Sequence, residues 1–208
     1  AVNPNGIILT STDVTSSWHP RTSGTTNDLN GVTYGNSTFV SAGNSGTILT
    51  SSDGTTWTKV TATYTSDNGS TETPSFNDVT YGNGTFVAVN PNGIILTSTD
   101  VTSSWTKSTS GTSNNLNGVT YGNSTFVSVG NSGTILTSSN GTSWSSRTSG
   151  TSNGLSGVTY GNSKFVAIGN SGTIVASSDG TSWDNVTKST TTTTYDNGTT
   201  ATITIKYT

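Results

Sequence analysis

The chain has 208 residues, of which 27% are hydrophobic and 8% are charged, and its formal net charge is −3 at pH 7. Its seven basic side chains are too few for the positive surface that nucleic acids or anionic membranes bind, so we expect neither as a partner. The sequence has no cysteine and no apolar run long enough for a membrane span, which excludes disulfide frameworks, thiol chemistry and a transmembrane helix.

The sequence is an internal repeat. Its opening string, AVNPNGIILTSTDVTSSW at 1–18, recurs unchanged at 88–105. The tryptophans mark the period, because the spacings along Trp18, Trp57, Trp105, Trp144 and Trp183 are 39, 48, 39 and 39. The repeat therefore has a period of 39, and one interval is longer by nine.

Each unit predicts four short strands. In the unit 116–144, alternating apolar and polar residues predict strands at 117–121, 125–129 and 134–138, and a fourth begins at the tryptophan. Gly-Asn and Asn-Gly pairs mark turns between them, and no stripe of helical period occurs. Four antiparallel strands repeated about every 40 residues are typical of a β-propeller blade.

We therefore predict an all-β fold: one five-bladed β-propeller domain over residues 1–208, with four-stranded blades of about 39 residues. The first blade is split between the chain ends, residues 188–208 plus 1–20. The other blades cover about 29–60, 76–108, 116–148 and 155–187, with an insertion at 60–76.

A polar turn precedes every tryptophan. It reads STDVTSSW at 11–18 and 98–105, SSDGTTW at 51–57, SSNGTSW at 138–144 and SSDGTSW at 177–183. These turns resemble the Asp-box, or BNR repeat, S-x-D-x-G-x-x-W. Two copies have the family length but carry Thr15 or Thr102 where glycine is usual. The other three are one residue shorter, and their Asp-Gly or Asn-Gly pair predicts a type I′ turn.

The resemblance implies a structural role for the box. The acidic residue accepts backbone N–H bonds within the turn, and the tryptophan packs between blades. We carry this role over to Asp13, Asp53, Asp100, Asn140 and Asp179, and to Trp18, Trp57, Trp105, Trp144 and Trp183. Two further aromatic sets recur once per unit, and we expect them to pack in the core: Tyr34, Tyr81, Tyr121 and Tyr160, with Phe39, Phe86, Phe126 and Phe165.

An enzyme is not expected, and neither is a cofactor. Sialidases also carry Asp-boxes, and that resemblance would imply three arginines around a carboxylate and a Tyr–Glu nucleophile pair. This chain has two arginines, Arg21 and Arg147, and one glutamate, Glu72. The single histidine, His19, excludes a histidine metal cluster.

The remaining surface is rich in Ser, Thr, Asn and Gly and poor in Lys and Glu, which favours an extracellular or cell-surface location. Seven Asn-x-Ser/Thr sequons are candidate glycosylation sites: Asn36, Asn68, Asn83, Asn123, Asn140, Asn185 and Asn197.

Two segments break the repeat. Residues 60–76 contain the turn sequence Asp-Asn-Gly and predict a projecting loop or small hairpin, either a tolerated insertion or a contact surface. Residues 188–208 align with the first two strands of a blade. The second arm of this tail alternates apolar and polar residues, which predicts a closure or assembly strand that includes Thr199, Ala201, Ile203, Ile205 and Tyr207.

The tail can complete the first blade in two ways. It can pair with residues 1–20 of its own chain and close the ring, or with those of the next molecule, which would build a filament by strand exchange.

Two function classes follow. The first is a non-enzymatic structural or adhesive propeller, with itself as partner in a filament or surface array. The alternative is a glycan-binding, lectin-like propeller, whose polar pockets would be formed by the repeated stretches RTSGTTNDLNG, STSGTSNNLNG and RTSGTSNGLSG. A designed propeller is a third possibility, against which the uneven insertion and the irregular tail argue.

Overall fold

The computed structural model describes residues 1–15, 17–102, 105–186, 190–193 and 200–203, and in the last two ranges it describes the backbone alone. Within these residues, the secondary structure consists of short β-strands and three 3-10 turns, as the all-β prediction requires.

Four sheets contain four antiparallel strands each, joined in chain order, and are named blades 1 to 4. Blade 1 consists of β4 (Leu29–Gly35), β5 (Thr38–Gly43), β6 (Thr47–Ser51) and β7 (Thr58–Thr61). Blade 2 consists of β10 (Asp78–Gly82), β11 (Thr85–Val89), β12 (Ile95–Ser98) and β13 (Thr106–Ser108). Blade 3 consists of β14 (Leu116–Gly122), β15 (Thr125–Gly130), β16 (Ile135–Ser138) and β17 (Ser145–Arg147), with η2 (Asn131–Gly133) between its second and third strands. Blade 4 consists of β18 (Leu155–Gly161), β19 (Lys164–Gly169), β20 (Ile174–Ser177) and β21 (Asp184–Asn185), with η3 (Asn170–Gly172).

Three smaller sheets complete the described chain. The half-blade at the N-terminus contains β1 (Val2–Asn3), η1 (Pro4–Gly6), β2 (Ile7–Thr10) and β3 (His19–Arg21). The insertion hairpin contains β8 (Tyr64–Thr65) and β9 (Thr71–Glu72), and the terminal hairpin contains β22 (Thr190–Thr193) and β23 (Thr200–Ile203).

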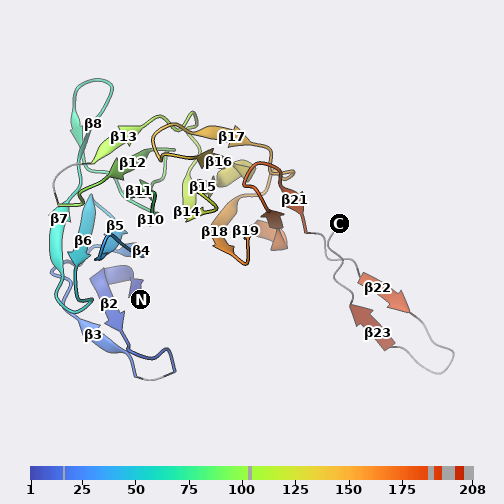
Figure 1. Cartoon of the computed structure of the whole chain (residues 1–208), viewed down its shortest axis with the longest axis horizontal. Helices are drawn as coiled ribbons and strands as arrows, with labels where there is room; N and C mark the ends of the chain where they lie inside the picture. The colour runs from blue at the N-terminus through green and yellow to red at the C-terminus, as the bar shows by residue number, and fades with distance from the viewer. Residues whose placement is uncertain (16, 103–104, 187–189, 194–199, 204–208) are drawn as a thin grey trace.

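The blades follow one another along an arc (Figure 1). Their first strands, β4, β10, β14 and β18, are neighbours in chain order and lie on the inside of the arc. The half-blade packs beside blade 1, where β1 and η1 contact β4. One end of the arc is therefore the half-blade, and the other end is blade 4.

The first two strands of each blade are joined by a tight two-residue turn. In blade 1, Gly35 pairs with Thr38, and the intervening Asn36 and Ser37 have φ angles of 47° and 57°. Positive φ at both central residues defines the type I′ turn, whose twist matches that of the flanking strands. Equivalent residues with positive φ lie in the other blades at Asn83-Gly84, Asn123-Ser124 and Asn162-Ser163.

The type I′ turn predicted for the three short boxes is wrong. In the short boxes the glycine has positive φ, for example 72° at Gly54, but Asp53 does not. The physical reason is that the aspartate caps the turn with its side chain in an ordinary backbone conformation, so that only the glycine needs the left-handed region.

Adjacent blades fit together through a tyrosine and a glycine. A Cβ atom placed on Gly122 would lie 2.1 Å from the ring of Tyr160 in the next blade, and one on Gly82 equally close to Tyr121. Gly35 receives Tyr81 in the same way. Each tyrosine ring therefore lies directly on the strand of the preceding blade, at a position where only glycine fits.

The hydrophobic core is divided into clusters between blades. Between blades 2 and 3, the fully buried Val87, Val89 and Ile95 of blade 2 meet Leu116 and Phe126 of blade 3. A similar cluster lies between blades 3 and 4. No blade has a closed core of its own within the described residues, and each blade depends on its neighbours for burial.

Within the described residues, the split first blade is not assembled. β22 and β23 pair with each other, as the predicted hairpin requires, but in the described residues neither pairs with β1, which is an edge of the half-blade. The pairing also differs from the pairing in blade 4. Thr193 lies opposite Thr200, whereas an alignment of the tail with the pair Tyr160–Phe165 puts Tyr195 opposite Thr200. In Figure 1 the terminal hairpin stands apart from the arc.

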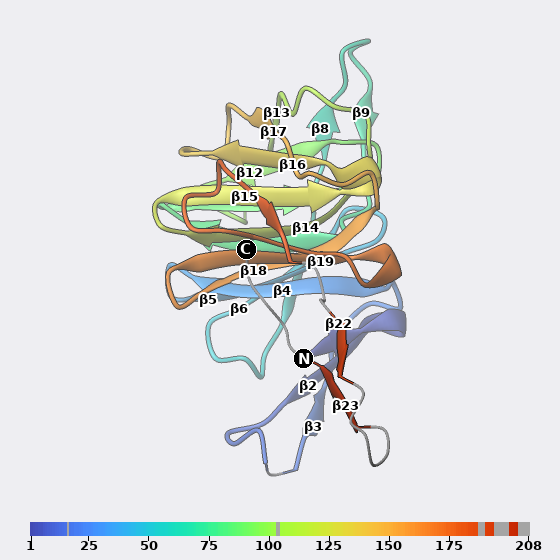
Figure 2. The ribbon, with the colours of Figure 1, turned by 90° about the vertical axis from the view of Figure 1, so that its right-hand side faces the viewer.

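The insertion forms the predicted projecting hairpin. Tyr64 pairs with Glu72, and both views show the hairpin extending beyond the blades (Figure 2). Its base is held by Ala62 and Phe76, which are buried in the cluster between blades 1 and 2.

Candidate functional site

The short boxes form capped turns. The Oδ1 atom of Asp53 accepts hydrogen bonds from the backbone N–H groups of Thr55 (2.8 Å) and Thr56 (2.7 Å), which lower the pKa of this carboxyl. Trp57 donates its indole Nε1–H to the carbonyl of Gly54 (3.1 Å). The same bonds recur around Asn140 and Asp179, with Trp144 and Trp183 as indole donors.

In the long boxes, Asp13 and Asp100 each accept bonds from the backbone and the hydroxyl of the threonine two residues later. The indole nitrogen of Trp105 is buried and has no hydrogen-bond partner among the described residues. In all five boxes, the acidic or amide side chain accepts bonds from its own turn.

The two identical strings lie in different surroundings. In blade 2, Val101 is 5% exposed and Trp105 6%, and both belong to the cluster with Val40 and Ile48 of blade 1. In the half-blade, their counterparts Val14 and Trp18 are 81% and 43% exposed. Because the two strings are identical, the difference in exposure comes from the strands around them. In the described residues, no preceding blade packs against the half-blade, and no strand equivalent to β10 of blade 2 pairs with it.

The described structure has an apolar groove beside the half-blade. It has a volume of about 410 Å³ and lies between the half-blade and blade 1. Trp18, Val32, Phe39 and Trp57 are among its lining residues. Val32 of blade 1 is 42% exposed, whereas its counterparts Val79 and Val119 in blades 2 and 3 are 3% and 4% exposed.

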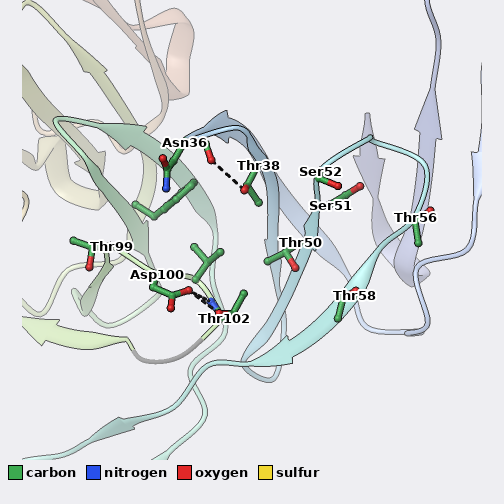
Figure 3. Close-up of a pocket in the computed structure, with 12 residues that line it drawn as sticks. Asn36, Thr38, Thr50, Ser51, Ser52, Thr56, Thr58, Thr99, Asp100 and Thr102 are labelled. Carbon is green, nitrogen blue, oxygen red and sulfur yellow. Dashed lines mark hydrogen bonds between the residues drawn. The ribbon is translucent and has the colours of Figure 1, made fainter.

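A second kind of groove is polar. Figure 3 shows one of about 430 Å³ between blades 1 and 2, where Asn36, Thr38 and Thr50 face Thr99 and Asp100 across the groove. Asp100 and Thr102 bond to each other there, and the Thr38 hydroxyl donates to the carbonyl of Asn36.

The repeated polar stretches also meet in a groove. Residues 111–114, from the connection between blades 2 and 3, and 148–151, from the next connection, line a groove of about 480 Å³. Arg147 lies in it and donates its Nε–H to Thr137 (2.8 Å). This is the place where the lectin-like alternative expects its pockets.

One partly buried carboxyl was not singled out from the sequence. Asp78 occupies the inner-strand position at which the other blades have Gly31, Gly118 and Gly157. Its Oδ1 accepts the N–H of Val79 (2.8 Å) and its Oδ2 that of Val119 in blade 3 (3.0 Å). Burial raises its pKa to about 6, against the opposing effect of these two bonds. The sequence FND at a place where sister units read LNG or LSG was the available sign.

The residues considered for catalysis lie in different sheets. Arg21 belongs to β3, Arg147 to β17 and Glu72 to β9, and Arg21 donates its Nε–H to Thr10 (2.7 Å). Within the part of the chain that the structure describes, no three His, Cys, Asp or Glu side chains gather where they could hold a metal ion. No helical segment there has the length and apolar character to cross a lipid bilayer.

The sequons have different environments. Asn36, Asn83 and Asn123 are exposed on the type I′ turns. Asn140 is engaged as a cap, and Asn68 accepts bonds from the Ser66 hydroxyl and the Ser70 N–H at the insertion hairpin. Asn185 is exposed in β21, and Asn197 lies outside the described residues.

Of the predicted assembly strand, Ala201 and Ile203 lie in β23, opposite Thr192 and Thr190. Thr199, Ile205 and Tyr207 lie outside the described residues.

No protein-family model and no curated protein sequence matches the chain. Solved structures do match it. YCF48 bound to a D1 peptide has a TM-score of 0.63 at 20% identity, over 88% of this chain and 61% of that one. The WD40 repeats of RRP9 have a TM-score of 0.64 at 9% identity, over 89% of this chain and 61% of that one.

The chain folds as a β-propeller. A GH74 enzyme from Niastella koreensis resembles this propeller too, with a TM-score of 0.60 at 21% identity, over 89% of this chain and 29% of the enzyme. The propeller thus spans less than two thirds of each of these three proteins. Identities this low establish the fold alone, because propellers serve many unrelated functions.

Proposed function

We propose that this propeller is a non-enzymatic structural or adhesive protein of a cell exterior, and that it assembles with copies of itself by exchanging its terminal hairpin. In the assembled state, a hairpin donated by one copy supplies the first strand of the half-blade of the next and most of its second strand, of which β1 is the last part. Each ring then has five blades, and a contact of this head-to-tail kind continues into a filament. The Asp-boxes serve as structural turns in every blade.

The observation that carries the proposal is the exposure of the N-terminal string. Val14 and Trp18 are uncovered, although the same residues in blade 2 are buried. Burying a large apolar side chain favours association by roughly 1.5–3 kcal/mol. The half-blade therefore has an apolar surface that matches a blade without its first strand and without most of its second strand.

The length of the tail favours exchange over closure in the same chain. The spacing from box tryptophan to inner-strand tyrosine is 16 from Trp105 to Tyr121. It is again 16 from Trp144 to Tyr160, but only 12 from Trp183 to Tyr195, the tyrosine that the sequence alignment places at the equivalent position. A connection that is shorter by four reaches about 13 Å less when extended.

The regular connection also has a fixed path. It places the carbonyl of Thr112 or Thr151 over a glycine of the preceding blade, Gly93 or Gly133. The corresponding glycine of blade 4, Gly172, has no described atom within 4 Å of a Cβ placed on it. Within the described residues, the contact of the regular connection is not repeated at Gly172, which supports exchange over closure within the same chain.

A fluorescence and sedimentation experiment tests the proposal. Dilute protein should sediment as the 21.2 kDa monomer, and concentrated protein as larger species. The fluorescence of Trp18 is obtained as the difference between the emission of the wild-type protein and that of the Trp18→Phe variant. Acrylamide should quench this fluorescence in the monomer, and it should quench it much less in the larger species. Trp105→Phe is the matched control, because Trp105 is buried in both states.

Two results would contradict the proposal. A monomer at every concentration with Trp18 accessible would exclude assembly. A monomer with Trp18 protected at every concentration would show closure of the ring by the chain's own tail.

Glycan binding is the second candidate, favoured by the groove that two repeated connections form beside Arg147. A glycan array would show selective binding that is lost in Arg147→Ala. The absence of binding at high protein concentration would rule this candidate out.

A further inference from the structure

Blade 4 ends the arc with an unoccupied tyrosine position. In blades 1 to 3, the glycine at the end of the first strand is covered by the tyrosine ring of the next blade. Gly161 is the same residue in blade 4, and no described atom lies within 4 Å of a Cβ placed there. Gly161 therefore lies at the position where the other blades receive a tyrosine ring, and no ring of the described residues covers it.

The apolar face around this position is also uncovered. Ile168 is 55% exposed and Ile174 is 38% exposed. Their counterparts in blade 3, Val129 and Ile135, are fully buried against blade 4. The pair in blade 2, Val89 and Ile95, is equally buried against blade 3. The side of each blade that carries these residues is thus the side that the next blade covers.

We propose that this face of blade 4, centred on Gly161, Ile168 and Ile174, is a docking surface for the terminal hairpin of a second copy, and that it takes an aromatic ring of that hairpin on Gly161. This inference rests on the proposed strand exchange, and it adds blade 4 as a second surface that contacts the donated hairpin. The donated hairpin is held on one side by the half-blade and on the other by blade 4.

The repeat identifies the kind of side chain that fits. In each blade interface, the ring that lies on the glycine belongs to the tyrosine of a Val-Thr-Tyr sequence. The tail has Thr-Thr-Tyr at residues 193–195, so Tyr195 is the ring that the donor offers by sequence; this residue lies outside the described part of the chain. The short connection before it favours a second copy over the same chain as the source.

A matched pair of glycine substitutions tests the docking surface in the 208-residue chain. Gly161→Ala adds a methyl group in open space, so the dilute monomer should unfold at the wild-type temperature. Because that methyl group occupies the position of the ring, the concentration needed for assembly should rise at least tenfold. Gly122→Ala is the control: its methyl group would lie 2.1 Å from the ring of Tyr160, so this variant should unfold at a lower temperature.

Thiol labelling gives an independent readout, because the chain has no cysteine of its own. The Ile168→Cys variant should react with a maleimide at full rate in the monomer and at least tenfold more slowly in the assembled protein. Ser163 is exposed on the turn after Gly161, so the Ser163→Cys variant is the control and should stay reactive in both states.

The outcomes separate the two proposals. If the protein assembles and protects Trp18, but Gly161→Ala assembles like wild type and the thiol of Ile168→Cys stays reactive, strand exchange stands and the blade 4 surface is wrong. If that thiol is protected in a monomer at every concentration, the chain's own tail occupies the surface, and the second copy is wrong. If nothing assembles and the thiol is reactive throughout, both proposals fail.

Discussion

At the scale of single residues, the repeat uses the same few atoms in each blade. A side-chain oxygen before each tryptophan accepts N–H bonds from its own turn, and in the short boxes the indole returns a bond to the glycine carbonyl. The acceptor is a carboxylate at Asp53 and an amide at Asn140, with the same geometry. The chemistry required is an acceptor oxygen, and a negative charge is not needed.

This equivalence gives the first prediction. Asp53→Asn should keep the urea midpoint of unfolding close to that of the wild-type protein, because Asn140 caps its turn with one oxygen. Asp53→Ala should lower the midpoint, because two turn N–H groups lose their acceptor. Asp67→Ala, which removes an exposed ion pair with Lys107, is the control and should have little effect. An Asp53→Asn variant as unstable as Asp53→Ala would contradict the interpretation.

Asp78 gives a prediction about pH. Its pKa in the folded protein is about 6, above the ordinary value of 3.8, so the folded state binds the proton more tightly than the unfolded state does. The contribution of Asp78 to the free energy of unfolding is therefore fully present below pH 4, and it is lost as the pH rises through about 6. This upward shift in the pKa of Asp78 corresponds to a contribution of at most about 3 kcal/mol to the free energy of unfolding.

Urea unfolding at pH 4, 5, 6 and 7 measures this dependence. The free energy of unfolding of the wild-type protein, relative to Asp78→Asn, should fall between pH 4 and pH 6. Asp13, Asp53 and Asp179 have lowered pKa values, so their contribution is lost at lower pH, as the solution is acidified below about 4. An Asp78→Asn variant with the same slope as the wild-type protein would show that another group is responsible.

At the scale of elements, one sequence has two energetic roles. Trp105 and Trp18 end identical strings, but Trp105 is packed against Phe76 with ring centroids 6.0 Å apart, and Trp18 is partly exposed beside the apolar groove. Trp105→Ala should cost about 3–5 kcal/mol, as for other buried aromatic residues. Trp18→Ala should cost about 1 kcal/mol or less in the dilute monomer. Equal losses, measured by urea unfolding, would contradict the open half-blade.

The elements also show what could be predicted from the sequence. The strands and the insertion hairpin follow from alternation and from turn residues such as Asn-Gly, because these patterns are local. The type I′ turn was assigned to the wrong connection, since Asn36-Ser37 adopts it without glycine while Asp53 caps with its side chain.

Other features depend on neighbours that a local pattern does not contain. Val14 and Val101 have the same sequence context and opposite exposure, so the string alone could not separate them. The partly buried position of Asp78 depends on Val119, which lies in the next blade. The uncovered surface at Gly161 is recognised only by comparison with Gly122, which the ring of Tyr160 covers.

At the scale of the whole molecule, the arc has two unlike ends. The half-blade exposes Trp18 and Val14, and blade 4 exposes Ile168, Ile174 and Gly161. The terminal hairpin pairs with neither end in the described residues. A propeller stabilises each blade through its neighbours, and in the proposed assembly the terminal hairpin is the donor and the half-blade is the acceptor.

Electron microscopy of the concentrated 208-residue chain, at a resolution that traces strands, tests the proposed strand exchange most directly. We predict rings with five blades, in which a hairpin at the start of one blade is continuous with the chain of the neighbouring ring. Isolated rings in which the same chain supplies all five blades would contradict it, and so would isolated arcs with the gap unfilled.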